Sequence, residues 1–102
     1  MRKMTSKERA TLKSAAQKLK PTFQIGAAEL HENVLKGLDD TFNTKELVKV
    51  KVNRADKSDK NIVREIANQI EEQINVQVVA VIGTTIILYR QHKDEDKRLL
   101  NA

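Results

Sequence analysis

Few side chains in this sequence have the type and spacing that catalysis or metal binding requires. His31 and His92 lie far apart in the chain, and neither belongs to a metal-binding spacing such as H-E-x-x-H. Asp39 and Asp40 are adjacent on a predicted helix, so their carboxylates point in different directions and indicate a solvated face. The chain has no cysteine, which excludes thiolate chemistry and disulfides. An enzyme therefore has little support, and its candidate groups would be His31 or Asp39.

Positive charge is more informative, because it is concentrated in two segments. The formal net charge of the chain is +5. Residues 1–21 carry seven basic residues and one acidic residue, and residues 45–60 carry six basic and three acidic residues. Lys49 and Lys51 stand two positions apart on a predicted strand, roughly 7 Å, which suits contacts with successive phosphates. This sorting predicts an anionic partner, RNA or DNA foremost. A solvated basic helix that aids solubility explains the first segment equally well.

Aromatic side chains are too few to suggest a base-stacking platform. Phe23 and Phe42 have the surroundings of core residues, and Tyr89 fits either the core or the surface. A sheet without exposed aromatic rings differs from an RNA-recognition motif, whose rings stack on bases. If nucleic acid binds, we expect contacts with its backbone and shape, and a weak sequence preference.

The elements that must position these side chains begin with a helix. Thr5 and Glu8 predict a capping box at its start, and Pro21 is expected to end it. Its apolar stripe comprises Leu12, Ala15, Ala16 and Leu19, and one flank of the stripe carries Arg9, Lys13 and Lys20.

Glu46 to Asn53 is the clearest strand, because its residues alternate strictly. Val48, Val50 and Val52 face one way, and Leu47, Lys49, Lys51 and Asn53 the other. One face is therefore predicted to be buried and the other at least partly exposed.

The remaining pattern completes an α/β domain of order αβαβαββ. A short strand at Phe23–Ile25 precedes a helix, and a third helix is expected after a cap at Ser58. Its apolar face comprises Ile62, Ile66, Ile70 and Ile74, with Val63 and Ala67 beside it. Two β-rich runs, Val76–Ile82 and Thr85–Arg90, are joined by a two-residue turn with glycine first. We expect a four-stranded mixed sheet packed against helices.

Four segments together resemble the bacterial YhbY-type proteins, stand-alone members of the CRM-domain family. They are "LKPTFQIG" (Leu19–Gly26), "ELVKVKV" (Glu46–Val52), "VQVVAVIGTTIILYR" (Val76–Arg90) and the basic opening helix. The resemblance runs from about residue 5 to residue 92. It implies a fold similar to the C-terminal domain of translation initiation factor three. It also implies binding to precursors of the large ribosomal subunit, no enzymatic activity and no cofactor.

The resemblance also implies an RNA-contacting loop. Family members carry a GxxG loop between the first strand and the next helix, where two glycines let the backbone approach phosphates. This chain keeps Gly26, followed by Ala27 and Ala28, but has Glu29 in place of the second glycine. Glu29 suits a helix start, yet its charge is expected to weaken the loop as an RNA clamp.

The sequence thus predicts an RNA-binding domain at residues 1–92 and a frayed or disordered charged tail at residues 93–102. The expected RNA-contacting residues are Arg9, Lys13, Lys20, Gly26, Ala27, Ala28, Lys49, Lys51 and Arg54. The alternative is an adaptor that uses the basic helix to dock on an acidic ribosomal or assembly protein. The lack of a signal peptide or a long apolar run predicts a soluble, cytoplasmic and preferably monomeric protein.

Overall fold

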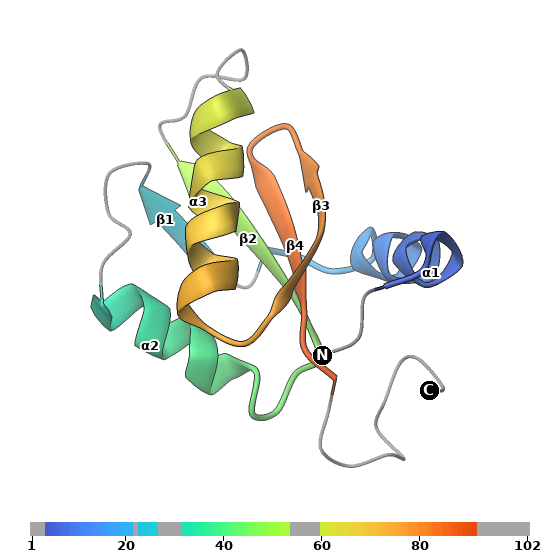
Figure 1. Ribbon diagram of the computed structural model, residues 1–102, viewed down its shortest axis with the longest axis horizontal. Helices are drawn as coiled ribbons and strands as arrows, with labels where there is room; N and C mark the ends of the chain where they lie inside the picture. The colour runs from blue at the N-terminus through green and yellow to red at the C-terminus, as the bar shows by residue number, and fades with distance from the viewer. Residues whose placement is uncertain (1–3, 22, 27–31, 54–59, 92–102) are drawn as a thin grey trace.

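The computed structural model describes residues 4–21, 23–26, 32–53 and 60–91. Their elements are α1 (Ser6–Ala16), β1 (Phe23–Gly26), α2 (Glu32–Thr41), β2 (Leu47–Asn53), α3 (Lys60–Gln73), β3 (Gln77–Ile82) and β4 (Thr85–Tyr89), as Figure 1 shows. The predicted order αβαβαββ is confirmed. Ser58 and the charged tail lie outside the described residues, so their predictions stay predictions.

The four strands form one mixed sheet in the order β1-β2-β4-β3. β1 pairs with β2 in parallel, whereas β4 pairs antiparallel with both β2 and β3. The parallel pair is joined through α2, as a crossover requires. Gly83 and Thr84 form the tight turn of the β3–β4 hairpin, and Gly83 has a φ of +59°, which glycine adopts without strain. The predicted mixed sheet and hairpin are confirmed.

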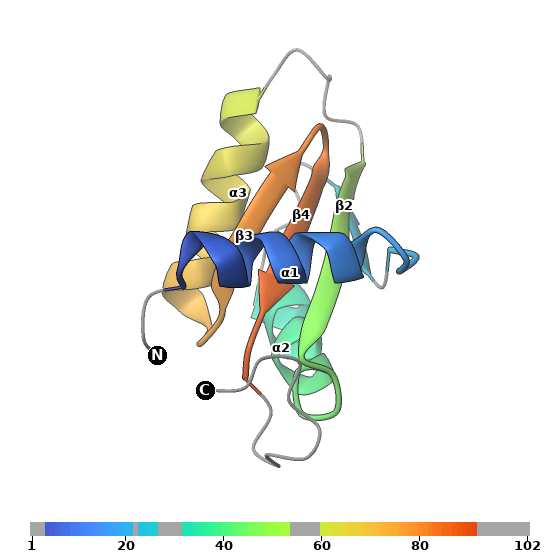
Figure 2. The same cartoon turned by 90° about the vertical axis from the view of Figure 1, so that its right-hand side faces the viewer.

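Helices cover both faces of the sheet, so the domain has two apolar cores (Figure 2). The core under α2 and α3 contains the three alternating valines of β2 together with Leu38, Phe42, Val63, Ile66, Ile70, Ile86 and Leu88. The core under α1 contains Leu12, Ala16, Leu47, Val79, Ile87 and Tyr89. Because the two sets come from opposite faces of β2 and β4, the predicted alternation in β2 is confirmed.

The start of α1 is fixed by the predicted capping box. The backbone N–H of Glu8 donates to the Thr5 hydroxyl at 3.1 Å, and the Thr5 N–H donates to the Glu8 carboxylate at 3.1 Å. Both orphan donors are satisfied, which explains why the helix begins at Ser6.

The end of α1 differs from the prediction. The α-helix stops at Ala16, and a tight turn carries the chain toward Pro21. Leu19 is therefore outside the apolar stripe, with 39% of its surface exposed. Lys20 also lies beyond the helix and does not continue the flank of Arg9 and Lys13. Pattern alone could not place this end, because nothing in the sequence breaks the helical spacing before Pro21.

In α3 the predicted apolar face is mostly correct. Val63, Ile66, Ala67 and Ile70 are buried. Ile62 instead is 37% exposed in the first turn, and Ile74 is half-buried just past the last residue of the helix.

A bulge interrupts the edge strand β3 near Val79, between Val78 and Ala80. Nη1 of Arg9 donates to the carbonyls of Val78 at 3.1 Å and Val79 at 2.5 Å, while the Val78 N–H donates to Glu71 at 2.8 Å. Two side chains from different helices therefore satisfy the backbone of this edge, which blunts it against pairing with another chain.

Arg90 connects three segments at the other end of the sheet. Its Nε donates to the Asn75 carbonyl at 2.6 Å, its Nη2 pairs with the Asp39 carboxylate, and its guanidinium lies 5.1 Å from the centre of the Phe42 ring. The neighbouring Tyr89 is 4% exposed. The open question about Tyr89 is thus settled in favour of the core.

Candidate nucleic-acid interface

A row of four side chains crosses the sheet on its α1 face, beyond the part that α1 covers. Gln24 of β1 pairs in register with Lys51 of β2, Lys51 with Thr85 of β4, and Thr85 with Ile82 of β3. Register partners point to the same face, and Lys51 shares its face with Leu47 of the α1 core. We call Gln24, Lys51, Thr85 and Ile82 the cross-strand row. Three members are exposed and Thr85 is half-buried.

The two lysines of β2 have different environments, although the alternating pattern of the strand assigns both to the same face. Nζ of Lys49 donates to the carbonyls of Ala16 at 3.4 Å and Leu19 at 3.3 Å, where α1 ends. The backbone of Lys51 pairs with the neighbouring strands, but its exposed ammonium makes no hydrogen bond or ion pair with another described residue. Lys51 thus offers its whole ammonium to a ligand, whereas Lys49 also holds α1 against the sheet.

Arg9, Lys13 and Gln17 follow one another at four-residue spacing along one flank of α1. Arg9 binds the β3 backbone, and Gln17 lines a hollow with Ile82, so this flank faces the β3–β4 hairpin. Lys13 lies between them and is exposed. Of these residues, Lys13 has its charge available to a ligand, while the Arg9 guanidinium is engaged at one nitrogen.

At the end of the sheet, Gly26, the first residue of the predicted glycine loop, lies next to β2. Gly26 and Asn53 are register partners, and Nδ2 of Asn53 donates to Oε1 of Gln24 at 3.3 Å. Gly26 is thus on the same face as the cross-strand row, two residues beyond Gln24 along β1. Ala27, Ala28 and Arg54 lie outside the described residues, so their predicted roles stay predictions.

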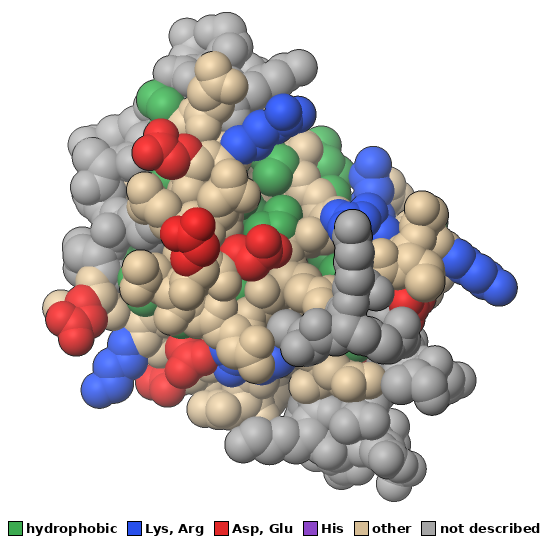
Figure 3. All heavy atoms as spheres, viewed as in Figure 1, with side chains coloured by type: hydrophobic (Ala, Val, Ile, Leu, Met, Phe, Trp, Pro, Cys, Tyr) green, Lys and Arg blue, Asp and Glu red, His purple; other side chains and the backbone are tan. Residues whose placement is uncertain are grey.

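Charge is divided between the two faces of the molecule. In the described residues of α1 and the turn after it, one acid, Glu8, accompanies Lys7, Arg9, Lys13, Lys18 and Lys20. The helices of the opposite face carry Glu32, Asp39, Asp40, Glu65, Glu71 and Glu72 against Lys36, Lys60 and Arg64. Figure 3 views that face and shows acidic side chains spread over α2 and α3. A polyanion is therefore attracted to the α1 face and repelled by the other.

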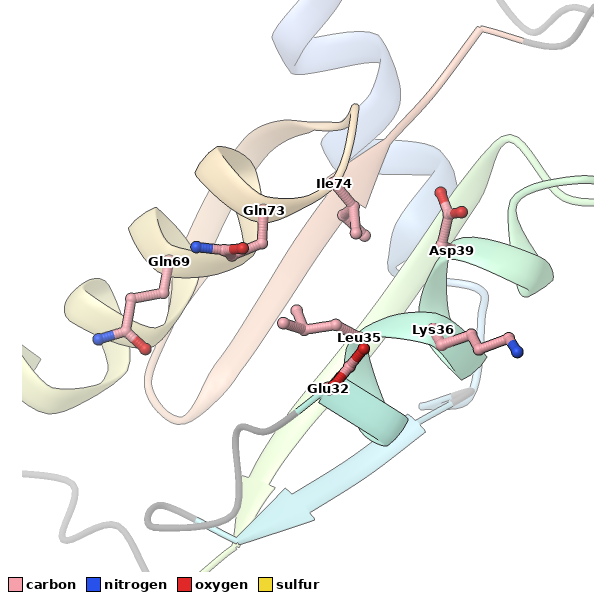
Figure 4. A pocket seen from close by; sticks show the side chains of 7 residues that line it. All are labelled: Glu32, Leu35, Lys36, Asp39, Gln69, Gln73 and Ile74. Carbon is pink, nitrogen blue, oxygen red and sulfur yellow. The ribbon is translucent and has the colours of Figure 1, made fainter.

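A larger hollow of about 670 Å³ lies between α2 and α3 on the acidic face. In Figure 4, Leu35 and Ile74 point across it, whereas Lys36 points away. Asp39 lines this hollow, but its carboxylate is paired with Arg90. Within the described ranges, no group of three or more acidic or histidine side chains could hold a metal ion. The hollow therefore has no metal-binding group among those residues.

Sequence reasoning did not select Gln17, Gln24, Ile82 and Thr85. The two-residue turn predicts that Ile82 and Thr85 pair, but only the order of the strands places that pair beside Lys51.

None of the helices among the described residues is long and apolar enough to cross a membrane.

Fold and site define a small α/β domain with a cationic face on a four-stranded mixed sheet. The model of the CRS1 / YhbY (CRM) domain matches residues 4–90, and the chain belongs to that family. The predicted resemblance is thus confirmed.

Three relatives illustrate the match. The probable RNA-binding protein YqeI of Bacillus subtilis is 33% identical over 91 residues, covering 89% of this chain and 92% of that protein. An RNA-binding protein of Haemophilus influenzae is 33% identical over 94 residues, covering 92% of each. The solution structure of the hypothetical protein SAV1595 from Staphylococcus aureus has a TM-score of 0.77 and 35% identity. The match covers 94% of this chain and 97% of the SAV1595 chain.

Proposed function

We propose that this protein binds RNA through phosphate contacts on its α1 face and assists assembly of the large ribosomal subunit. Lys51 carries the most weight for this proposal, because it lies exposed at the centre of the cross-strand row. Lys13 and Lys20 add exposed cations from α1 and the turn after it. Gly26 adds backbone at the end of the same face.

Relatives and charge support the RNA-binding part. Relatives of this chain are named as RNA-binding or probable RNA-binding proteins. The acidic α2 and α3 face would repel a phosphate backbone, which leaves the α1 face as the binding surface. The choice of precursor large-subunit rRNA comes from the resemblance to YhbY-type proteins.

The test is binding of the purified protein to large-subunit rRNA fragments across a salt series. About five contacts with a single strand predict a loss of roughly a hundredfold in affinity between 50 and 200 mM salt. Removing two contacts with the double variant Lys13→Gln/Lys51→Gln should lower the slope of log K against log salt by about 1.4. Affinity should fall roughly 25-fold at 100 mM salt.

The matched control is Lys36→Gln/Arg64→Gln, which removes the same charge from exposed positions on the opposite face. Equal losses in the two double variants would mean that net charge, not the α1 face, sets the affinity. No binding of the wild type at 50 mM salt would refute direct RNA binding. A ribosomal association that survives ribonuclease would then favour the protein adaptor.

A further inference from the structure

A small hollow lies between the end of α1 and the β3–β4 hairpin, at one end of the cross-strand row. Its volume is about 260 Å³, and it is lined by Gln17, Lys49, Ile82, Thr85 and Ile87. At roughly 30 Å³ per water molecule, it has room for about nine waters. That space is large enough to receive a single nucleobase.

The hollow combines an apolar surface with a polar rim. Ile87 is buried, whereas Ile82 is 46% exposed and forms an apolar wall on the edge strand. Ile82 is the most exposed of the three large apolar side chains that are exposed in the described part of the chain. Gln17 and Thr85 supply an amide and a hydroxyl beside this wall. Such a site suits a flat group with apolar faces and polar edges.

We propose that this hollow receives one unstacked nucleobase of the bound RNA, a role that rests on the proposed RNA-binding function. Ile82 packs against the face of the base. The Gln17 amide, which both donates and accepts, meets its hydrogen-bonding edge. Lys49 has three ammonium protons and gives two to the carbonyls of Ala16 and Leu19, so one remains for a base oxygen or nitrogen.

The neighbouring charges favour a nucleotide over a peptide side chain. Lys51 pairs with Thr85 and lies two strands from Ile82, roughly 10 Å at ordinary strand spacing. One extended nucleotide can bridge that separation, with its phosphate at Lys51 and its base at Ile82. Base contact of this kind requires unpaired RNA, because a paired base is not available to the hollow. The protein therefore prefers single-stranded segments and reads the base at one position.

The test compares single-stranded RNA nonamers with a nonamer duplex, using the full chain. One adenine of the single strand is replaced by 2-aminopurine, whose fluorescence rises when it leaves its stacked neighbours. Wild type is expected to bind the single strand more tightly and to brighten the probe. Ile82→Ala should lower single-strand affinity three- to tenfold and abolish the brightening. Affinity for the duplex and the salt slope should stay unchanged, because the phosphate contacts remain.

Ile62→Ala is the matched control, because Ile62 is 37% exposed but belongs to α3 on the opposite face. It should leave both affinities and the fluorescence as in wild type. Gln17→Ala keeps the apolar wall and should change the ranking among uridine, adenosine and cytidine nonamers more than the mean affinity.

Several outcomes would overturn the base site. They are equal losses of single-strand and duplex binding in Ile82→Ala, unchanged brightening in that variant, or the same losses in Ile62→Ala. A ribonuclease-resistant protein association that Ile82→Ala abolishes would assign the hollow to a protein partner instead. If wild type binds RNA while Ile82→Ala has no effect, only the base site fails. If wild type binds no RNA at 50 mM salt, the proposed function fails with it.

Discussion

Nζ of Lys49, in the middle of β2, lies 3.3 Å from the carbonyl oxygen of Leu19, just past the end of α1. A second bond to the Ala16 carbonyl makes this lysine a cap for the helix. A cation at a helix C-terminus is favourable because the last carbonyls carry partial negative charge. A strand residue that the sequence assigns to RNA binding therefore also fixes where the first helix ends.

Replacing Lys49 by methionine should destabilise the fold, because the aliphatic stem is kept and the capping ammonium is lost. We expect the free energy of unfolding to fall by about 1 kcal/mol. Urea unfolding followed by circular dichroism measures this change. Lys51→Met is the control on the same strand face, with an expected change below about 0.5 kcal/mol. Equal effects of the two substitutions would contradict the cap.

Local signals in the sequence predicted the elements that local contacts specify. The capping box needs Thr5 and Glu8, three residues apart, and the hairpin turn needs Gly83 and Thr84. The alternation of apolar and polar residues in β2 also predicted its two faces, because successive side chains of a strand point to opposite sides of the sheet.

Roles that depend on distant partners could not be predicted in this way. Arg9 contacts the backbone of Val79, which is 70 positions away in the sequence. The contact lies at a β-bulge that the pattern of apolar residues does not predict. Lys49 and Lys51 follow the same pattern, yet α1 covers only the first. The cross-strand row depends on the strand order β1-β2-β4-β3. Alternation within a single strand does not predict which strands are neighbours.

Gly37 offers a site where alanine should stabilise the protein. It lies inside α2, and a Cβ at this position would lie 3.6 Å from Cζ of Phe23, an ordinary contact. Alanine in a helix interior is favoured over glycine by about 0.5–1 kcal/mol. Gly37→Ala should raise the free energy of unfolding by that amount in urea. A loss of stability would mean that α2 cannot accept the new contact with Phe23.

The same substitution at Gly83 should have the opposite sign. Gly83 has a φ of +59°, and a Cβ there would meet nothing within 4 Å, so the cost is confined to the backbone. An L residue in this conformation costs about 1–2 kcal/mol. Gly83→Ala should lower thermal stability accordingly, and Gly83→Asn should lower it less because asparagine tolerates this region. An equal loss for both substitutions would point to a cause other than backbone conformation.

Replacing Arg90 should destabilise the fold more than most substitutions of polar residues, because its side chain contacts α2 and the segment between α3 and β3 at once. It bonds the Asn75 carbonyl and the Asp39 carboxylate, and its own side chain is 18% exposed. Arg90→Gln removes the charge and most donors, so we expect the free energy of unfolding to fall by about 2 kcal/mol. Arg90→Lys should recover part of this loss, since an ammonium restores the charge but not the planar fork. Arg64→Gln, on the exposed surface of α3, is the control and should change stability by less than about 0.5 kcal/mol. If Arg90→Gln unfolds at the wild-type urea concentration, these contacts do not stabilise the native state, and the shared end of α2, β3 and β4 is held by its apolar core alone.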